Sequence, residues 1–128
     1  MLATGQVLRQ KKILVVEDEF LIAEELAEEI RDLGAYVLGP VRTPMEALRL
    51  IERETPDCVV LNAILQGAAA TELVQHLRKL EVPYVVVTGY PIEGLPSQFR
   101  ESISVIKPHD QETLQMAIMK AMLQRQED

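Results

Sequence analysis

Cysteine, tryptophan and long apolar runs are scarce or missing in this sequence. Its 128 residues include one cysteine and no tryptophan, and the aromatic content is 4%. A single cysteine excludes an internal disulfide, and the position of Cys58 within an apolar run predicts a buried, reduced thiol. Because aromatic residues are so few, a core must be built mainly from Leu, Ile, Val, Ala and Met. The hydrophobic content of 48% is sufficient for one.

Membrane spans, leader peptides and basic surfaces are also missing. No apolar run is long enough to cross a bilayer, and the first ten residues lack the apolar stretch of a signal peptide. The 13 basic residues stand against 20 acidic ones, which gives a formal net charge of −7. This balance disfavours non-specific binding to nucleic acid or to anionic membranes, since both need a basic face. We therefore expect a soluble cytoplasmic domain that binds neither.

Five short apolar runs alternate with segments whose apolar residues recur at helical spacing. We predict strands at residues 13–16, 36–38, 58–61, 84–87 and 103–106. We predict helices at residues 20–33, 44–54, 71–80, 97–101 and 111–124, with a small-residue loop at 66–70. A single domain, residues 12–124, would then lie between an N-terminal lead-in, residues 1–11, and a polar tail, residues 125–128.

This alternation predicts a doubly wound α/β fold with a five-stranded parallel sheet. Strand–helix–strand units favour parallel pairing and right-handed crossovers. Five such units suit a flavodoxin-like (βα)5 sheet with the strand order 2-1-3-4-5. In that order the first and third strands are neighbours. Their carboxyl ends meet where the order reverses, and sheets of this type bind ligands there.

Polar residues follow four of the five predicted strands. The first strand leads into Glu17 and Asp18, the third into Asn62, the fourth into Thr88 and the fifth into Lys107. Taken singly, each residue has a simpler explanation, such as a solvated acid in the first turn of a helix or a turn-favouring asparagine. At matching strand ends they should converge on one edge of the sheet. The set as a whole therefore indicates a functional site.

These motifs resemble the receiver domain of two-component response regulators. The resemblance covers roughly residues 12–123 and rests on the motifs Val15-Val16-Glu17-Asp18-Glu19, Pro56-Asp57 with Leu61-Asn62, Val87-Thr88-Gly89 and Ile106-Lys107-Pro108. No single motif is specific, but the set in this order and spacing is. The turn Thr88-Gly89-Tyr90 is similar to that of a subgroup described by a Thr-Gly-Tyr motif.

The resemblance implies a role for each residue of the set. In receivers the acidic pair, here Glu17 and Asp18, binds Mg²⁺ together with a main-chain carbonyl, here that of Ile64. This oxygen-rich set suits Mg²⁺, and phosphoryl transfer needs positive charge near the phosphoryl oxygens. A hydroxyl and a lysine bind the phosphoryl group, and an aromatic residue acts as a switch; the matching positions are Thr88, Lys107 and Tyr90.

Asn62 departs from the family, because receivers carry there the aspartate that accepts a phosphoryl group from a histidine kinase. A carboxamide oxygen is neutral, is a poor nucleophile and cannot form a mixed anhydride with phosphate. The loss of one negative charge should also weaken Mg²⁺ binding. Ser104 and His109 depart as well, since aromatic residues are usual at both positions.

We therefore expect a single-domain receiver that is not an enzyme, has lost direct phosphorylation and acts through protein contacts. Its partner would be a histidine kinase or another signalling protein. A homodimer through the fifth strand and the last helix is a further expectation, since family members use that face for contacts.

Two other functions fit the fold. An FMN- or nucleotide-binding flavodoxin-like protein would need a phosphate-binding loop after the first strand, where Glu17-Asp18-Glu19 would repel phosphate. A metal-dependent phosphatase or nuclease would need an aspartate nucleophile or further acidic ligands on other strands. Neither set of residues is present, so the receiver is the favoured interpretation.

Overall fold

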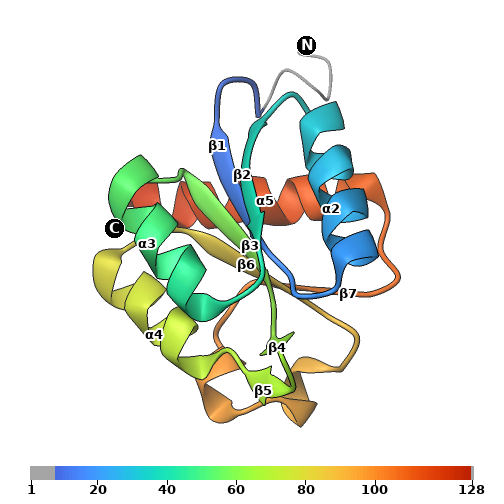
Figure 1. The fold of residues 1–128 in the computed structure, drawn as a ribbon, viewed down its shortest axis with the longest axis vertical. Helices are drawn as coiled ribbons and strands as arrows, with labels where there is room; N and C mark the ends of the chain where they lie inside the picture. The colour runs from blue at the N-terminus through green and yellow to red at the C-terminus, as the bar shows by residue number, and fades with distance from the viewer. Residues whose placement is uncertain (1–7, 128) are drawn as a thin grey trace.

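A parallel sheet of five strands, in the order β2-β1-β3-β6-β7, forms the centre of the molecule (Figure 1). The computed structural model describes residues 8–127, so most of the expected lead-in and Asp128 lie outside the described residues. The strands are β1 (Lys12–Val16), β2 (Tyr36–Val41), β3 (Cys58–Asn62), β6 (Tyr84–Thr88) and β7 (Ser104–Ile106). All four pairings are parallel, which confirms the doubly wound fold and the predicted order.

Two helices cover each face of the sheet, as Figure 1 shows. One face packs against α2 (Phe20–Asp32) and α5 (Gln111–Glu127), and the other against α3 (Pro44–Glu54) and α4 (Thr71–Leu80). The predicted end of the last helix at residue 124 is wrong. The helix continues to Glu127 because residues 124–127 contain neither Gly nor Pro and are all good helix formers.

The central strands are apolar throughout because both of their faces are buried. Successive side chains of β1 and β3 point to opposite faces, so each strand contributes to both cores. The side chains on the α2 and α5 side are Ile13, Val15, Cys58 and Val60. Those on the α3 and α4 side are Leu14, Val16, Val59 and Leu61. Burial raises the pKa of the Cys58 thiol to about 12, so the thiol is protonated, as predicted for a buried cysteine.

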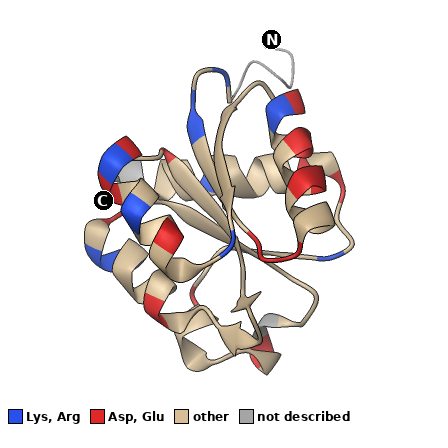
Figure 2. Cartoon of the chain, viewed as in Figure 1, with Lys and Arg blue, Asp and Glu red and all other residues tan. Residues whose placement is uncertain are grey.

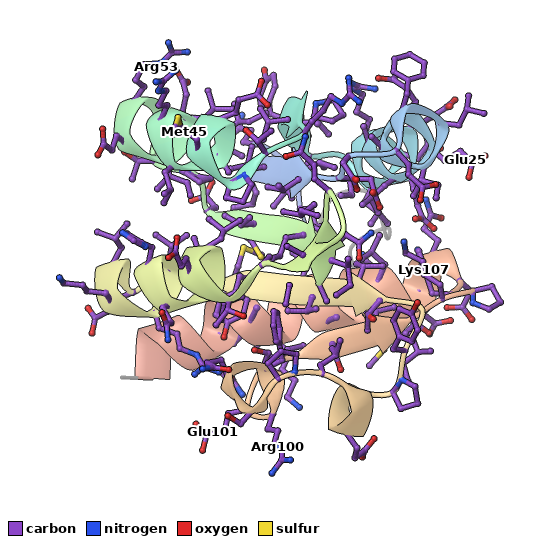
Figure 3. All side chains as sticks on the ribbon, turned by 60° about the horizontal axis from the view of Figure 1, so that its bottom comes forward. Glu25, Met45, Arg53, Arg100, Glu101 and Lys107 are labelled. Atoms are coloured by element: carbon purple, nitrogen blue, oxygen red, sulfur yellow. The ribbon has the colours of Figure 1, made fainter. Side chains whose placement is uncertain are left out.

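Helix α2 shows the amphipathic pattern expected from the sequence. Its apolar side buries Leu26 and Ile30 against the sheet, while Glu24, Glu25 and Glu28 are exposed. Figure 2 shows acidic residues along the outer side of this helix, and Glu25 points to solvent in Figure 3. Leu8 is also completely buried in the core below α2. The part of the lead-in that is described therefore belongs to the folded domain.

Two connections differ from the prediction. Strand β2 does not end at Leu38 but continues to Val41, which pairs with Val16 after an irregularity in the register. Gly39 permits this path: its φ is +83°, and a Cβ atom would lie 2.7 Å from the nitrogen of Val41. The expected loop at residues 66–70 contains a hairpin, β4 (Ile64–Leu65) and β5 (Ala68–Ala69), whose two turn residues both have positive φ.

The predicted helix at residues 97–101 is absent. The segment between β6 and β7 instead forms two short 3₁₀ turns, Ile92–Gly94 and Ser97–Phe99. Pro91, Gly94 and Pro96 limit the first turn, and the second turn, which lies within the predicted range, is anchored by the fully buried Phe99.

Within residues 8–127, each helix is too short or too polar to cross a membrane.

Candidate functional site

Three strand ends bring Glu17, Asn62 and Lys107 into contact at the carboxyl edge of the sheet. The Asn62 Nδ2 atom donates to Glu17 Oε1 at 3.0 Å, and Lys107 Nζ donates to the same oxygen at 3.4 Å. These residues follow β1, end β3 and follow β7, so contacts over 45 and 90 positions of sequence depend on the strand order. Figure 3 shows Lys107 at this end of the sheet.

The carboxamide of Asn62 bonds at both ends. Its Nδ2 donates to Glu17, while its Oδ1 accepts a bond of 3.2 Å from the backbone nitrogen of Ile64, the first residue of β4. A carboxylate at this position could accept from Ile64 but could not donate to Glu17. The amide therefore links the end of β1 to the start of the hairpin, and this link depends on asparagine.

Glu17 is buried, with 1% of its surface exposed, although it is an acid. Its Oε1 accepts from Asn62 and Lys107, and its Oε2 accepts from the backbone nitrogen of Glu19 at 3.1 Å. A carboxylate taken out of water needs such partners, because an unpaired buried charge is strongly unfavourable. The sequence placed Glu17 on the rim correctly but gave no sign that it would be buried.

Asp18 differs from its neighbour because it is only partly buried. Its Oδ2 accepts a bond of 2.9 Å from the backbone nitrogen of Gln66, in the turn of the hairpin. Burial acts to raise the pKa of Asp18, but the Gln66 bond, together with Glu17 and the positive charge of Arg42, outweighs burial and lowers the pKa below its ordinary value. The ionised form of Asp18 is therefore favoured, and its bond to Gln66 connects the hairpin to the site.

Thr88 and Tyr90 lie beside this network without joining it through their side chains. The buried Thr88 hydroxyl accepts from the backbone nitrogen of Tyr90 at 3.0 Å. The backbone carbonyl of Thr88 accepts a bond of 2.8 Å from the backbone nitrogen of Lys107, which fixes the backbone of this lysine next to β6. The side chain of Tyr90 is 60% exposed and faces away from the core.

The oxygen atoms at this edge of the sheet are of the kind that bind Mg²⁺. Glu17 and Asp18 supply carboxylate oxygens, which Mg²⁺ prefers, and Ile64 could add its carbonyl. Both oxygens of Glu17 already accept hydrogen bonds, and the ammonium of Lys107 lies beside one of them. Residues 8–127 hold no group of three or more His, Cys, Asp or Glu side chains placed to bind a metal. The site therefore offers the oxygen ligands that Mg²⁺ prefers, but two of these ligands are carboxylates where receivers have three.

Sequence analysis missed a second link across the site. His109 Nε2 lies 2.8 Å from Glu29 Oε1, and Gln111 Nε2 donates to the Glu29 carbonyl at 3.3 Å. The segment after β7 therefore contacts α2 near its end through His109 and Gln111, and contacts Glu17 through Lys107. No local pattern could have indicated a pair that lies 80 positions apart. Only the departure at His109 marked the position as unusual.

Comparison with known proteins identifies the family. Residues 13–119 match the response regulator receiver domain, and the chain belongs to this family. The phyllosphere-induced regulator PhyR of Methylorubrum extorquens is 32% identical over 119 residues, which cover 90% of this chain and 45% of that protein. The chain spans about half the length of the curated relatives it matches.

Solved structures agree with this assignment. The response regulator PhyR from Brucella abortus superposes with a TM-score of 0.76 at 30% identity, covering 98% of this chain and 53% of that one. The PhyR receiver domain of Erythrobacter litoralis, solved by NMR, gives a TM-score of 0.77 at 28% identity and covers 91% of this chain and 93% of that one. The nucleotide-binding and hydrolase alternatives are not favoured by these relatives.

Proposed function

We propose that this receiver of the Thr-Gly-Tyr subgroup has lost direct phosphorylation and signals through protein contacts. The observation that carries the proposal is the carboxamide of Asn62, which is bonded at both ends and leaves no nucleophilic oxygen at the acceptor position. Thr88 and Lys107 match the hydroxyl and the lysine that bind the phosphoryl group in receivers, and the same role is proposed for them here. Only the acceptor is missing on this reading, so the asparagine would hold the domain in one state.

Binding of Mg²⁺ is proposed to be weak and centred on Glu17 and Asp18. Two carboxylates are available in place of three, and Lys107 competes for Glu17. Titration with Mg²⁺, followed by NMR, should shift the amides of Glu17, Asp18 and Ile64 more than others. The largest shifts at a distant position would refute the assignment.

The decisive test is the substitution Asn62→Asp, followed by incubation with acetyl phosphate and Mg²⁺. Intact mass should show one added phosphoryl group on the variant and none on the unsubstituted chain. The added mass should disappear with hydroxylamine, which cleaves acyl phosphates. Asn62→Ala is the matched control, because it removes the amide without adding a nucleophile. Equal phosphorylation of the unsubstituted chain would overturn the proposal.

The contact surface is proposed to be the face formed by β7 and α5, which would bind a second copy or a signalling partner such as a histidine kinase. Ile106 on β7 and Met116 on α5 are 52% and 62% exposed, so both elements offer a large apolar side chain for such a contact. Arg100 and Lys120 are exposed, and Arg100 points to solvent in Figure 3.

Charge reversal tests this surface. Lys120→Glu or Arg100→Glu should weaken self-association in sedimentation experiments, or capture of a histidine kinase. Arg53→Glu, on the remote helix α3, is the matched control. If neither reversal changes the sedimentation coefficient at any concentration or the capture of the kinase, this face is not the interface.

A further inference from the structure

A groove of about 400 Å³ lies at the amino edge of the sheet, opposite the site described above. It is bounded by the end of α4, the start of β6, the loop before β7 and the end of α5. The groove exists because β7 pairs with β6 only from Val86 onward, so that Tyr84 and Val85 extend beyond the neighbouring strand. The tyrosine ring and the loop at residues 101–103 line the resulting space.

An arginine held by two hydroxyl groups is the main polar feature of this groove. Arg78 Nε donates to the Tyr84 hydroxyl at 2.9 Å, and Arg78 Nη2 donates to Ser102 Oγ at 3.4 Å. The two hydroxyl oxygens are themselves hydrogen-bonded at 2.8 Å. One edge of the guanidinium is therefore fixed by neutral groups from β6 and the following loop. A guanidinium in a fixed orientation loses less freedom when it binds an anion.

The positive charge of Arg78 is not neutralised within the described side chains. The ion pairs among them are Lys107–Glu17 and His109–Glu29. Glu81 and Glu101 line the same groove, yet neither lies within ion-pair distance of Arg78. Glu101 points to solvent in Figure 3. The terminal edge of the guanidinium, with its Nη1 atom, thus has donors in the geometry that matches a carboxylate.

One part of the groove is apolar. Beside Glu81 and Glu101, it has a floor of apolar side chains, namely Leu77, Val82, Ile103 and Ala121. We propose that this groove binds a small monocarboxylate with an apolar body, whose carboxylate pairs with Arg78 while its hydrocarbon part lies on this floor. The charges of Glu81 and Glu101 would repel a doubly charged phosphate more strongly than a singly charged acid, which favours a monocarboxylate as the ligand.

The place of the groove gives such a ligand an effect on the rest of the domain. Strand β6 begins at Tyr84 in the groove and ends at Thr88 on the carboxyl edge. After Thr88 the chain returns to the amino edge, and Ser102 lies near the end of this connecting segment, just before β7. A ligand that fixes Arg78 and Ser102 would restrain this segment without phosphoryl transfer. Ligand binding in the groove does not depend on whether Asn62 prevents phosphorylation, because the groove contains none of the residues at the carboxyl edge.

The experiment uses the full chain and three probes in NMR titrations: isovalerate, isovaleramide and inorganic phosphate. Isovalerate should cause saturable shifts at Ser102, Ile103 and the Nε–H of Arg78, with an affinity roughly in the millimolar range for a ligand of this size. Isovaleramide has the same shape without the charge and should bind about tenfold more weakly. Phosphate should cause no saturable shift in the groove.

Variants decide whether the arginine is responsible. Arg78→Gln should reduce isovalerate affinity about tenfold, and Tyr84→Phe should reduce it less, because it loosens the guanidinium without removing its charge. Arg53→Gln, an exposed arginine in the last turn of α3, is the matched control and should bind normally. Unsaturable shifts, shifts centred outside the groove, or equal binding by Arg78→Gln would each overturn the proposal. Phosphorylation of Asn62→Asp is read separately and does not bear on it.

Discussion

The two edges of the sheet differ in how a charged side chain is paired. At the carboxyl edge, the buried Glu17 is compensated by Asn62 and Lys107, which come from two other parts of the sheet. At the amino edge, Arg78 is held by two neutral hydroxyls and keeps its charge. The same parallel sheet therefore presents a hydrogen-bonded network around a buried carboxylate at one end and a groove with an arginine outside ion-pair distance of its glutamates at the other.

The difference follows from what each edge lacks. At the carboxyl edge, the amide of Asn62 bonds both to the buried Glu17 and to the backbone of Ile64. At the amino edge, no described carboxylate lies within ion-pair distance of Arg78. Stability measurements on single substitutions can separate a closed network from an open one, because removing a partner is costly only where the remaining group is buried.

The largest effect is expected for Asn62→Asp without metal. The substitution removes the donor to Glu17 and adds a like charge beside it, so the free energy of unfolding should fall by about 3 kcal/mol. Asn62→Ala removes the donor alone and should cost about 2 kcal/mol. Chemical denaturation at neutral pH measures both. Added Mg²⁺ should restore much of the loss in the aspartate variant and none in the alanine variant, and the opposite order would contradict the network described for this edge.

Lys107→Met should have the next largest effect. The ammonium is 28% exposed and 3.4 Å from its partner, so screening by solvent limits the loss to about 1 kcal/mol although Glu17 itself is buried. Thermal unfolding compares this variant with Lys120→Met, a substitution of an exposed lysine on α5 that should leave the midpoint unchanged. Equal effects of the two substitutions would mean that Lys107 does not stabilise the closed edge.

A smaller effect is expected at the amino edge. Tyr84→Phe removes the hydroxyl that accepts from Arg78, but the arginine is exposed and can turn to water. The loss should be about 0.5 kcal/mol. Tyr36→Phe is the control, since Tyr36 is 66% exposed at the start of β2. A loss for Tyr84→Phe as large as that for Asn62→Ala would show that the amino edge is closed as well.

The smallest effect concerns Asp18 and appears only in acid. Because its pKa is lowered from 3.8 in the folded state, Asp18 contributes stability that is present above that value and lost as the pH falls through the folded pKa. The stability difference between the parent chain and Asp18→Asn should therefore shrink between about pH 5 and pH 3. Urea titrations at several pH values test this, with Asp32→Asn, exposed on α2, as the control. A difference that grows in acid would have the wrong sign.

Sequence patterns predicted the periodic parts of the molecule well. Continuous apolar runs flanked by turn residues identified all five strands, and the bounds of α3 and α4 were predicted to the residue. The alternation of elements then determined the order, which brings Glu17, Asn62 and Lys107 together. The ends of the other four strands, unlike that of β2, were predictable because a polar residue after a buried run marks the edge of the sheet.

The missed features depend on contacts that leave no local pattern. The pair of His109 with Glu29 and the group of Arg78, Tyr84 and Ser102 join residues far apart in sequence. The helix predicted at residues 97–101 is a single 3₁₀ turn, Ser97–Phe99, in keeping with so short a segment. The hairpin at Ile64 was missed because β5 consists of two alanines, which have little strand propensity, and its register comes from the turn.

The lone thiol in the central strand makes the protein its own unfolding reporter. Cys58 is completely buried, with a pKa of about 12, so a thiol reagent in neutral buffer meets no reactive thiolate in the folded molecule. Modification must wait until the core between the sheet and helices α2 and α5 opens around Cys58. The rate of labelling in native buffer would therefore measure how often this core opens, without a denaturant, a dye or an introduced probe.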